Sequence, residues 1–225
     1  MSAPVRRTVE LFYDVVSPYA WIGFEMMNRY KTKWNIDLQL KPFFLGGVMQ
    51  ATGNQAPIML QAKARYLHVD LGRLAEYYKI PIKLPANPAE VLFEKGTLKP
   101  MRFVTAVDTK NKNQTEEISR QLWLRVWNQD KDITEKESMI EAGKAAGLSD
   151  ADIKDALERM GTKEVKDRLK EYTQQAIDYG AFGAPTFVAH VNGKKEMVFG
   201  SDRINIVAHL LGEKFEGPLT ELSKL

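Results

Sequence analysis

The chain opens with an apolar run that leads into a helical pattern of apolar and polar positions. Residues 8–14 are rich in β-branched and aromatic side chains, as a buried strand would be. Over residues 19–30 the apolar side chains recur at helical spacing, with Glu25, Asn28 and Arg29 between them. Residues 36–42 alternate with a period of two and end at Pro42. This order predicts a βαβ unit with two parallel strands.

The middle of the chain is dominated by helical patterns. The pair Gly46-Gly47 and the stretch from Gly53 to Ala56 favour a loop, which ends where Pro57 could start a helix, and a loop of this length is more often functional than idle. We expect helices over residues 59–78, 100–109, 115–128, 134–146 and 149–160, and an extended segment over 80–85. We interpret the stripe along the first of these helices mostly as core: Leu60, Lys63, Tyr66, Leu67, Leu71, Leu74 and Tyr78. Residues 134–137 (Thr-Glu-Lys-Glu) have the form of a capping box.

The last third of the chain returns to a mixed pattern. A helix over residues 162–179 is followed by a strand over 186–191, a two-residue turn at Asn192-Gly193, a strand over 196–199 and a helix over 204–211. Without the helical block, the remaining order is the thioredoxin arrangement. We therefore predict an α/β fold in which a thioredoxin-like domain (residues 1–60 and 175–225) carries a large all-helical domain (61–174) inserted after the βαβ unit.

Composition narrows the functional classes. The chain has 225 residues, is 44% hydrophobic and carries a formal charge of +3. No basic stripe with interleaved aromatic residues favours nucleic acid, and no apolar run is long enough to span a bilayer. We expect neither a nucleic-acid partner nor membrane insertion, and we find no secretory signal. The final residues Ser223-Lys224-Leu225 match a peroxisomal address, with the mitochondrion as the alternative location.

The chain contains no cysteine and three scattered histidines. The absence of cysteine excludes disulfides, thiolate metal sites and a catalytic thiol carried by the protein itself. We also expect no metal site, because the histidines are not grouped.

The most informative site lies where the first strand meets the first helix. Thioredoxin-like proteins place a Cys-x-x-Cys there, because the helix N-terminus favours a thiolate. In this chain the place is held by Ser17-Pro18-Tyr19-Ala20, so the sulfur must be imported, and glutathione is the obvious thiol. Helix-end charge and a hydrogen bond from Ser17 together could lower a free thiol pKa of ~8.5 by about one to three. The alternative is that Ser17 is only an N-cap, with Pro18 at the first helical position.

Three other places could complete this site. Ala184-Pro185 stands before a strand, where thioredoxin-like folds keep a cis-proline and offer backbone groups to an extended peptide. Ser201-Asp202 at a helix start could hold the γ-glutamyl group or could cap the helix. Asn54 and Lys63 could reach the glycine carboxylate, although each alone is also typical of a turn or surface.

Several ordered motifs carry a resemblance to a known family. They are Glu10-Leu11-Phe12-Tyr13-Asp14, Ser17-Pro18-Tyr19, Gly53-Asn54, Met101-Arg102-Phe103, Leu122-Trp123, Val126-Trp127, Tyr179-Gly180-Ala181-Phe182-Gly183, Phe199-Gly200-Ser201-Asp202-Arg203 and His209-Leu210-Leu211-Gly212-Glu213-Lys214. Over essentially its whole length the sequence resembles the kappa-class glutathione transferases, which are related to the 2-hydroxychromene-2-carboxylate isomerases.

The resemblance implies a homodimer that binds glutathione as co-substrate. It implies that Ser17 stabilises the thiolate, that Pro18, Tyr19 and Pro185 lie beside it, and that the tripeptide is held by Asn54, Lys63, Ala184, Ser201, Asp202 and Arg203. Family members often have Ser at the position of Ala20 and Leu at the position of Ala184, so the electrophile pocket is expected to differ.

These observations support three functions. The leading one is a transferase that conjugates glutathione to electrophiles such as aryl halides, and glutathione peroxidase activity towards hydroperoxides is a further candidate. The second is a glutathione-dependent isomerase, and the third is a non-catalytic glutathione-binding or chaperone-like module. A disulfide oxidoreductase of the DsbA kind is excluded, because no cysteine exists.

Overall fold

A four-stranded mixed sheet forms the centre of the protein. The computed structural model describes residues 5–225, with the side chains of residues 92 and 93 outside the description. The strands are β1 (Arg7–Tyr13), β2 (Ile36–Pro42), β3 (Thr186–Val191) and β4 (Lys194–Phe199), and their order is β2-β1-β3-β4. β1 pairs in parallel with β2 and antiparallel with β3, and β3 pairs antiparallel with β4. The predicted βαβ unit and hairpin are both confirmed.

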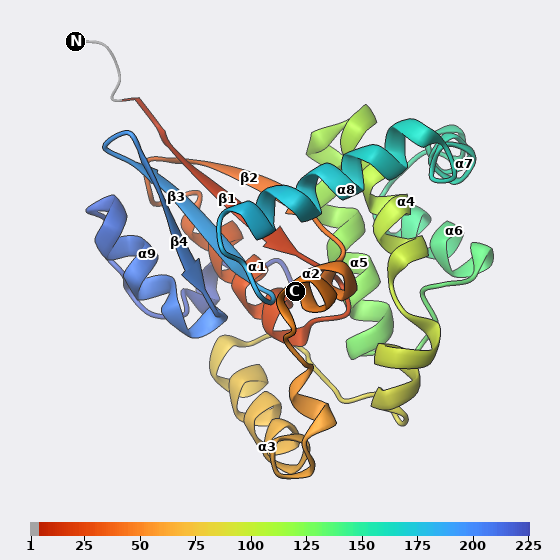
Figure 1. The fold of residues 1–225 in the computed structure, drawn as a ribbon, viewed down its shortest axis with the longest axis horizontal. Helices are drawn as coiled ribbons and strands as arrows, with labels where there is room; N and C mark the ends of the chain where they lie inside the picture. Colours follow the sequence, from red (N-terminus) through yellow and green to blue (C-terminus); the bar gives the residue numbers. More distant parts are fainter. Residues whose placement is uncertain (1–4) are drawn as a thin grey trace.

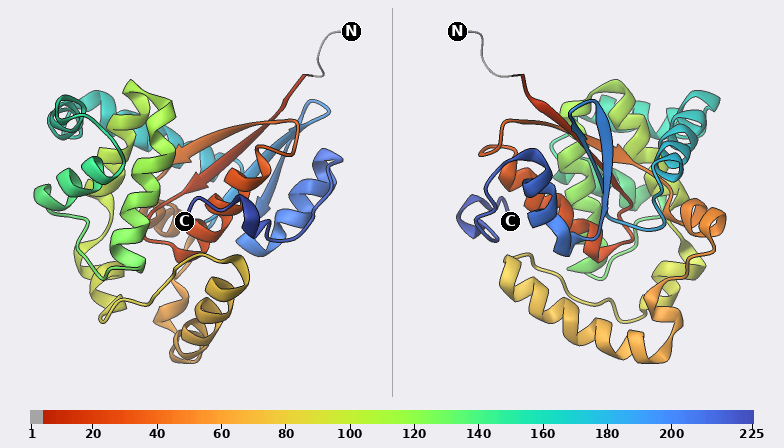
Figure 2. Two further views of the ribbon diagram at one scale, coloured as in Figure 1. Left: turned by 180° about the vertical axis from the view of Figure 1, so that it is seen from behind. Right: turned by 60° about the vertical axis from the view of Figure 1, so that its left-hand side comes forward.

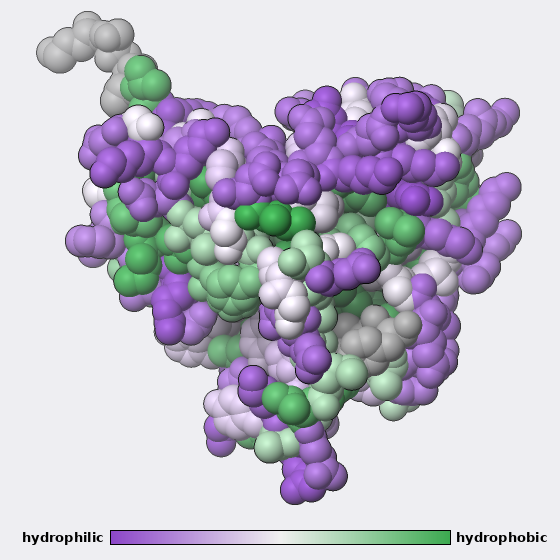
Figure 3. Space-filling model, viewed as in Figure 1, coloured by the Kyte–Doolittle hydropathy of each residue, from purple (hydrophilic) through white to green (hydrophobic). Residues whose placement is uncertain are grey.

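Helices cover both faces of this sheet (Figures 1 and 2). α1 (Pro18–Tyr30) and α9 (Ile204–Leu211) pack on one face, and α2 (Leu45–Thr52) and α8 (Lys163–Asp178) pack on the other. Successive side chains of β1 point to opposite faces of the sheet. Leu11 and Tyr13 pack in the core under α1, and Phe12 packs in the core under α8. The outward side of α8 is hydrophilic, and apolar residues gather below it across the middle of the same face (Figure 3).

A helical insertion lies between β2 and β3, as the sequence predicts. Besides α8, it comprises α3 (Gln61–Tyr78), α4 (Leu98–Lys110), α5 (Thr115–Trp127), α6 (Lys136–Ala145) and α7 (Asp150–Arg159). A π-helical turn spans Glu90–Lys95, and short 3-10 turns span Pro57–Met59, Lys112–Gln114, Ser201–Arg203 and Thr220–Leu222. Helices α4 to α8 pack on one another beside the sheet, whereas α3 projects from the opposite end of the molecule (Figure 1). The proposed domain boundaries at residues 60 and 175 stay a prediction.

α5 attaches the insertion to the thioredoxin-like part through buried polar contacts. The guanidinium of Arg120 lies 2.8 Å from a carboxylate oxygen of Glu25 on α1, and both side chains are 2% exposed. Tyr13 and Ser119 share a hydrogen bond of 2.7 Å between their hydroxyls. These groups satisfy one another away from water, so the two parts of the chain form one continuous core.

Three sequence predictions were wrong. The stretch read as a loop contains α2, whose N-terminal amides are satisfied by remote side chains: Asp14 accepts from Leu45 and Thr173 accepts from Phe44. The capping box before α6 does not form: Asp132 accepts the amide of Thr134, which Glu137 was expected to accept, and the Thr134 hydroxyl donates to Asp132.

The third error concerns α3. Leu71 is the residue of this helix that is fully buried, and Leu60 and Tyr66 are more than half exposed. Leu67, Leu74 and Tyr78 are only partly buried because they face a cleft. Among residues 5–225, no helix is long and apolar enough to cross a membrane.

Candidate active site

A cleft of about 590 Å³ opens between α3 and the end of the sheet where β1 stops. Antiparallel pairing sets Phe12 beside Thr186, so the residues after β1 face the residues before β3. The cleft brings together nine of the ten residues that the sequence nominated: Ser17, Pro18, Tyr19, Asn54, Lys63, Ala184, Pro185, Ser201 and Asp202. Elements separated by up to 185 positions in the chain therefore converge on one site.

Ser17 is held at the N-terminus of α1 and faces the cleft. Its side chain is an N-cap, because Oγ accepts the backbone N–H of Ala20 at 3.1 Å. The hydroxyl donates a long hydrogen bond of 3.4 Å to the carbonyl oxygen of Ala184. Such a bond is weak and easily exchanged for a better acceptor. The N-cap and thiolate-binding interpretations of Ser17 are therefore compatible.

Trp123 is a core residue, as the sequence predicts, and it also supports the site. Its indole N–H donates to the backbone carbonyl oxygen of Ser17 at 3.1 Å, across 106 positions of sequence. The ring packs against Tyr13 and Phe24 and stacks parallel to Trp21. The insertion thus fixes the turn that presents Ser17.

The peptide bond between Ala184 and Pro185 is cis, as the thioredoxin arrangement predicts for this place. α1 approaches Pro185 closely at Gly23, where an added Cβ would lie 3.0 Å from the proline ring and 3.0 Å from the ring of Phe187. A larger residue at position 23 would therefore push Pro185 or Phe187 by a few tenths of an ångström.

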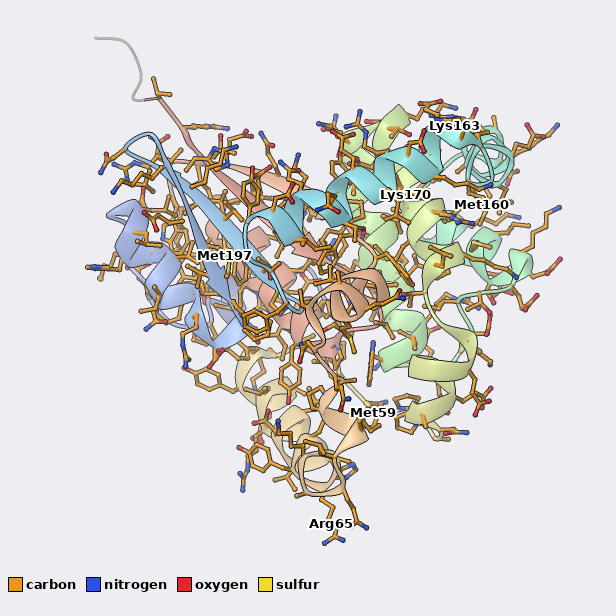
Figure 4. All side chains as sticks on the ribbon, viewed as in Figure 1. Met59, Arg65, Met160, Lys163, Lys170 and Met197 are labelled. Atoms are coloured by element: carbon orange, nitrogen blue, oxygen red, sulfur yellow. The ribbon has the colours of Figure 1, made fainter. Side chains whose placement is uncertain are left out.

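The glycine-carboxylate end of the predicted site is open. Asn54 uses its amide to bond the carbonyl oxygen of Phe182 at 2.7 Å, and its side-chain oxygen accepts from the amide of Gln55. It thus fixes the loop before Pro185. The ammonium of Lys63 has no partner among the described residues, so it is available to a ligand. Arg65 projects from α3 away from the sheet (Figure 4).

At the opposite side of the cleft, Ser201 and Asp202 follow β4. No side chain caps the start of α9, so these residues are not explained as helix caps. Gly200 has φ +99, and an added Cβ would lie 2.6 Å from a carboxylate oxygen of Asp202, so glycine leaves room for that carboxylate. Arg203 does not line the cleft, and its guanidinium forms an ion pair with Asp202.

Tyr19 connects α1 to α3 across the cleft. Its hydroxyl donates to the carboxylate of Asp70 at 2.7 Å. Burial and the hydrogen bond to Asp70 raise the pKa of the Tyr19 phenol, which stays protonated at neutral pH. The bond holds α3 close to the residues that follow Ser17.

A buried carboxyl group supports the same turn from below. Asp14 is fully buried and accepts hydrogen bonds from the amide of Val16, the amide of Leu45 and the hydroxyl of Thr97. Burial raises the pKa of Asp14 to about 6, although the three hydrogen bonds oppose the rise. Sequence reasoning missed this role because two of the donors are 31 and 83 positions away.

The described part of the chain holds no group of three or more His, Asp or Glu side chains suited to a metal ion. The site therefore consists of hydroxyl, backbone, amide and charged groups around an open cleft.

Comparison with known proteins identifies the family. A family model described as the DSBA-like thioredoxin domain matches residues 8–212. Glutathione S-transferase kappa 1 of Homo sapiens is 49% identical over 216 residues, which cover 96% of each chain, and the Rattus norvegicus protein of the same name is 44% identical over the same share. The solved structure of a 2-hydroxychromene-2-carboxylate isomerase covers 91% of this chain and 94% of its own with a TM-score of 0.71, and at 21% identity it shows the shared fold. The chain therefore belongs to the kappa-class glutathione S-transferases, within the DSBA-like thioredoxin family.

Proposed function

We propose that this enzyme activates glutathione as a thiolate in the cleft and transfers it to small electrophiles. The observation that carries the proposal is the Ser17 hydroxyl, which lies at a helix N-terminus in the cleft. It donates only a long hydrogen bond, to the carbonyl oxygen of Ala184. Because Oγ accepts the amide of Ala20, its O–H is polarised and becomes a better donor. A bound thiolate is a stronger acceptor than the Ala184 carbonyl.

The remaining groups fit the tripeptide. The free ammonium of Lys63 suits the glycine carboxylate, and the carboxylate of Asp202 suits the γ-glutamyl ammonium. Residue 184 offers backbone groups, so alanine at this position serves as well as leucine for binding. With an aryl halide, the sulfur forms a C–S bond, the C–halogen bond breaks, and the halide leaves with the electron pair. The thiol proton goes to solvent.

Replacing the hydroxyl tests the proposal. In Ser17→Ala the bound thiolate loses a hydrogen bond to a charged acceptor worth roughly 1.5–3 kcal/mol, so the pKa of bound glutathione should rise by about one to two. Titration of thiolate absorbance in the complex measures this pKa. Ser149→Ala is the matched control, because Ser149 caps α7 through the amide of Asp152 and lies outside the cleft. An unchanged titration in Ser17→Ala would overturn the role of the hydroxyl.

The same thiolate supports a peroxidase reaction. It attacks the O–O bond of a hydroperoxide, an alcohol leaves, and a second glutathione converts the resulting sulfenic acid to the disulfide and water. One oxidised glutathione per hydroperoxide consumed is the expected stoichiometry. An isomerase would instead turn over its substrate without consuming glutathione, so measuring glutathione during turnover separates the two reactions.

Assembly and location complete the proposal. We expect a homodimer, and the exposed apolar side chains Met59, Leu60, Val69 and Tyr77 near or on α3 favour association. Sedimentation at the mass of one chain would contradict it. We expect a peroxisomal location from Ser223-Lys224-Leu225. A fluorescent tag placed before residue 1 should follow peroxisomes, and Leu225→Asp should disperse it. A mitochondrial signal would favour the alternative.

A further inference from the structure

The four tryptophans differ in how their indole N–H groups are satisfied. Trp21 donates to Glu25, Trp34 to the carbonyl oxygen of Lys214, and Trp123 to the carbonyl oxygen of Ser17. The N–H of Trp127 meets no acceptor among the described residues, although this side chain is only 1% exposed. A buried donor without a partner lowers the stability of the fold. The unpaired N–H of Trp127 therefore indicates a role other than packing.

Trp127 shares the cleft with Ser17, beside which the sulfur is expected. It follows Trp123 by four residues on α5, so the two rings occupy the same face of the helix, about 6 Å apart along its axis. Trp123 contacts the carbonyl oxygen of Ser17 directly. Trp127 is therefore one helical turn from the tryptophan that bonds Ser17, and it lines the same cleft as Ser17.

Apolar side chains line this part of the cleft around Trp127. Leu74 of α3 and Pro88 belong to the cleft lining together with Trp127. The turn at Ser201–Arg203 and α5 both contact α1, and α9, which follows that turn, lies across the molecule from α5 (Figure 1). The backbone amide of Lys83 donates to the carbonyl oxygen of Trp127 at 2.5 Å, which fixes the extended segment against the end of α5.

The geometry points to Trp127 as the residue that selects the second substrate. That substrate is a planar aromatic electrophile with an oxygen acceptor, which takes the indole N–H while the ring packs against apolar side chains of the lining such as Leu74 and Pro88. The inference rests on the proposed function and names the electrophile class. For a nitro-substituted aryl chloride, the C–S bond forms, negative charge moves transiently to the nitro oxygen, and chloride then leaves with the electron pair. The indole N–H donates to that oxygen.

Binding of two finished conjugates tests this role without relying on turnover. S-(2,4-dinitrophenyl)glutathione carries oxygen acceptors, whereas S-benzylglutathione has an aromatic ring of similar size without them. Trp127→Phe keeps an aromatic ring and removes the N–H. Calorimetry should show affinity for the dinitrophenyl conjugate weakened about 3- to 10-fold, with affinities for the benzyl conjugate and glutathione changed less than about 2-fold.

Trp34→Phe is the matched control, because it removes an N–H that bonds Lys214 away from the cleft and should leave all three affinities unchanged. Equal losses for both conjugates, or no loss for either, would overturn the assignment of Trp127. If the parent enzyme binds the conjugates selectively but forms none, the proposed transferase activity fails while the subsite stands. If it conjugates electrophiles but Trp127→Phe does not discriminate, the subsite fails and the activity stands.

Discussion

Ser17 shows which features of a site can be predicted from neighbouring residues in the sequence. Its N-cap role and the proline after it are contained in four consecutive residues, so the sequence was sufficient to find it. What orients Ser17 is not local, because its carbonyl oxygen is held by Trp123 from the insertion. A tryptophan at helical spacing reads as core, and nothing nearby reveals that its N–H serves another element. The contact could have been found only from the fold.

The raised pKa of Asp14 predicts how the stability of the protein depends on pH. The pKa of this carboxyl is raised by burial from 3.8 to about 6, so the folded state binds the proton more tightly than the unfolded chain. Its ionisation therefore costs stability as the pH rises from about 4 to about 6. In Asp14→Asn this loss is absent.

Unfolding free energies measured between pH 4 and pH 7 check the prediction. Relative to Asp14→Asn, the parent protein should lose about 2 kcal/mol over this range and then level off. The two proteins are compared by the slope of unfolding free energy against pH. The amide side chain of the variant also alters the hydrogen bonds with Leu45 and Thr97, but this shifts the free energy by an amount that does not depend on pH. Parallel curves for the two proteins would contradict a raised pKa.

At the scale of elements, periodicity located nearly all the helices but not what they face. α3 was found at its correct position, yet its stripe was assigned to the core, because a cleft-lining face and a core face have the same 3.6-residue period. α2 was missed because its cap donors and acceptors are tertiary. Asp14 and Thr173 accept the amides that a local N-cap side chain would otherwise accept. Such a local N-cap would have indicated a helix after Phe44.

The α1–α5 junction predicts a large effect of one substitution. Arg120→Met removes the partner of Glu25 and leaves a carboxylate that is 2% exposed without its guanidinium. Breaking a buried pair in this way costs about 3–5 kcal/mol. Urea unfolding should report the loss, and Lys154→Met, in an exposed pair with Glu158, should cost less than about 0.5 kcal/mol. Similar midpoints for the two variants would show that the junction does not depend on this pair.

For the whole molecule, the C-terminal segment joins the two parts of the fold. Arg29 on α1 donates to the carbonyl oxygen of Pro218 and to the hydroxyl of Ser223. Lys224 pairs with Glu116 at the start of α5 at 2.7 Å. The segment therefore spans from the thioredoxin-like part to the insertion, a connection that no local sequence pattern indicated. Two of the three residues of the peroxisomal motif take part in it.

Glu116 makes this connection sensitive to acid. Burial alone would raise its pKa, but hydrogen bonds from Lys224, Lys31 and Arg120 outweigh burial and lower the pKa to about 2. A depressed pKa adds stability that is fully present above the unfolded value of 4.5 and is lost as the pH falls through the folded value. The stabilisation should reach about 3 kcal/mol at neutral pH.

Glu116→Gln removes this contribution. Its unfolding free energy should lie below that of the parent by a constant amount above pH 5, and the gap should close between pH 4.5 and pH 2. Glu76→Gln, on the exposed side of α3, should show no such convergence. A gap that stays constant down to pH 2 would mean that Glu116 acts through packing alone. Convergence would show that a single carboxylate couples the C-terminal segment, α1 and the insertion, and that acid releases all three together.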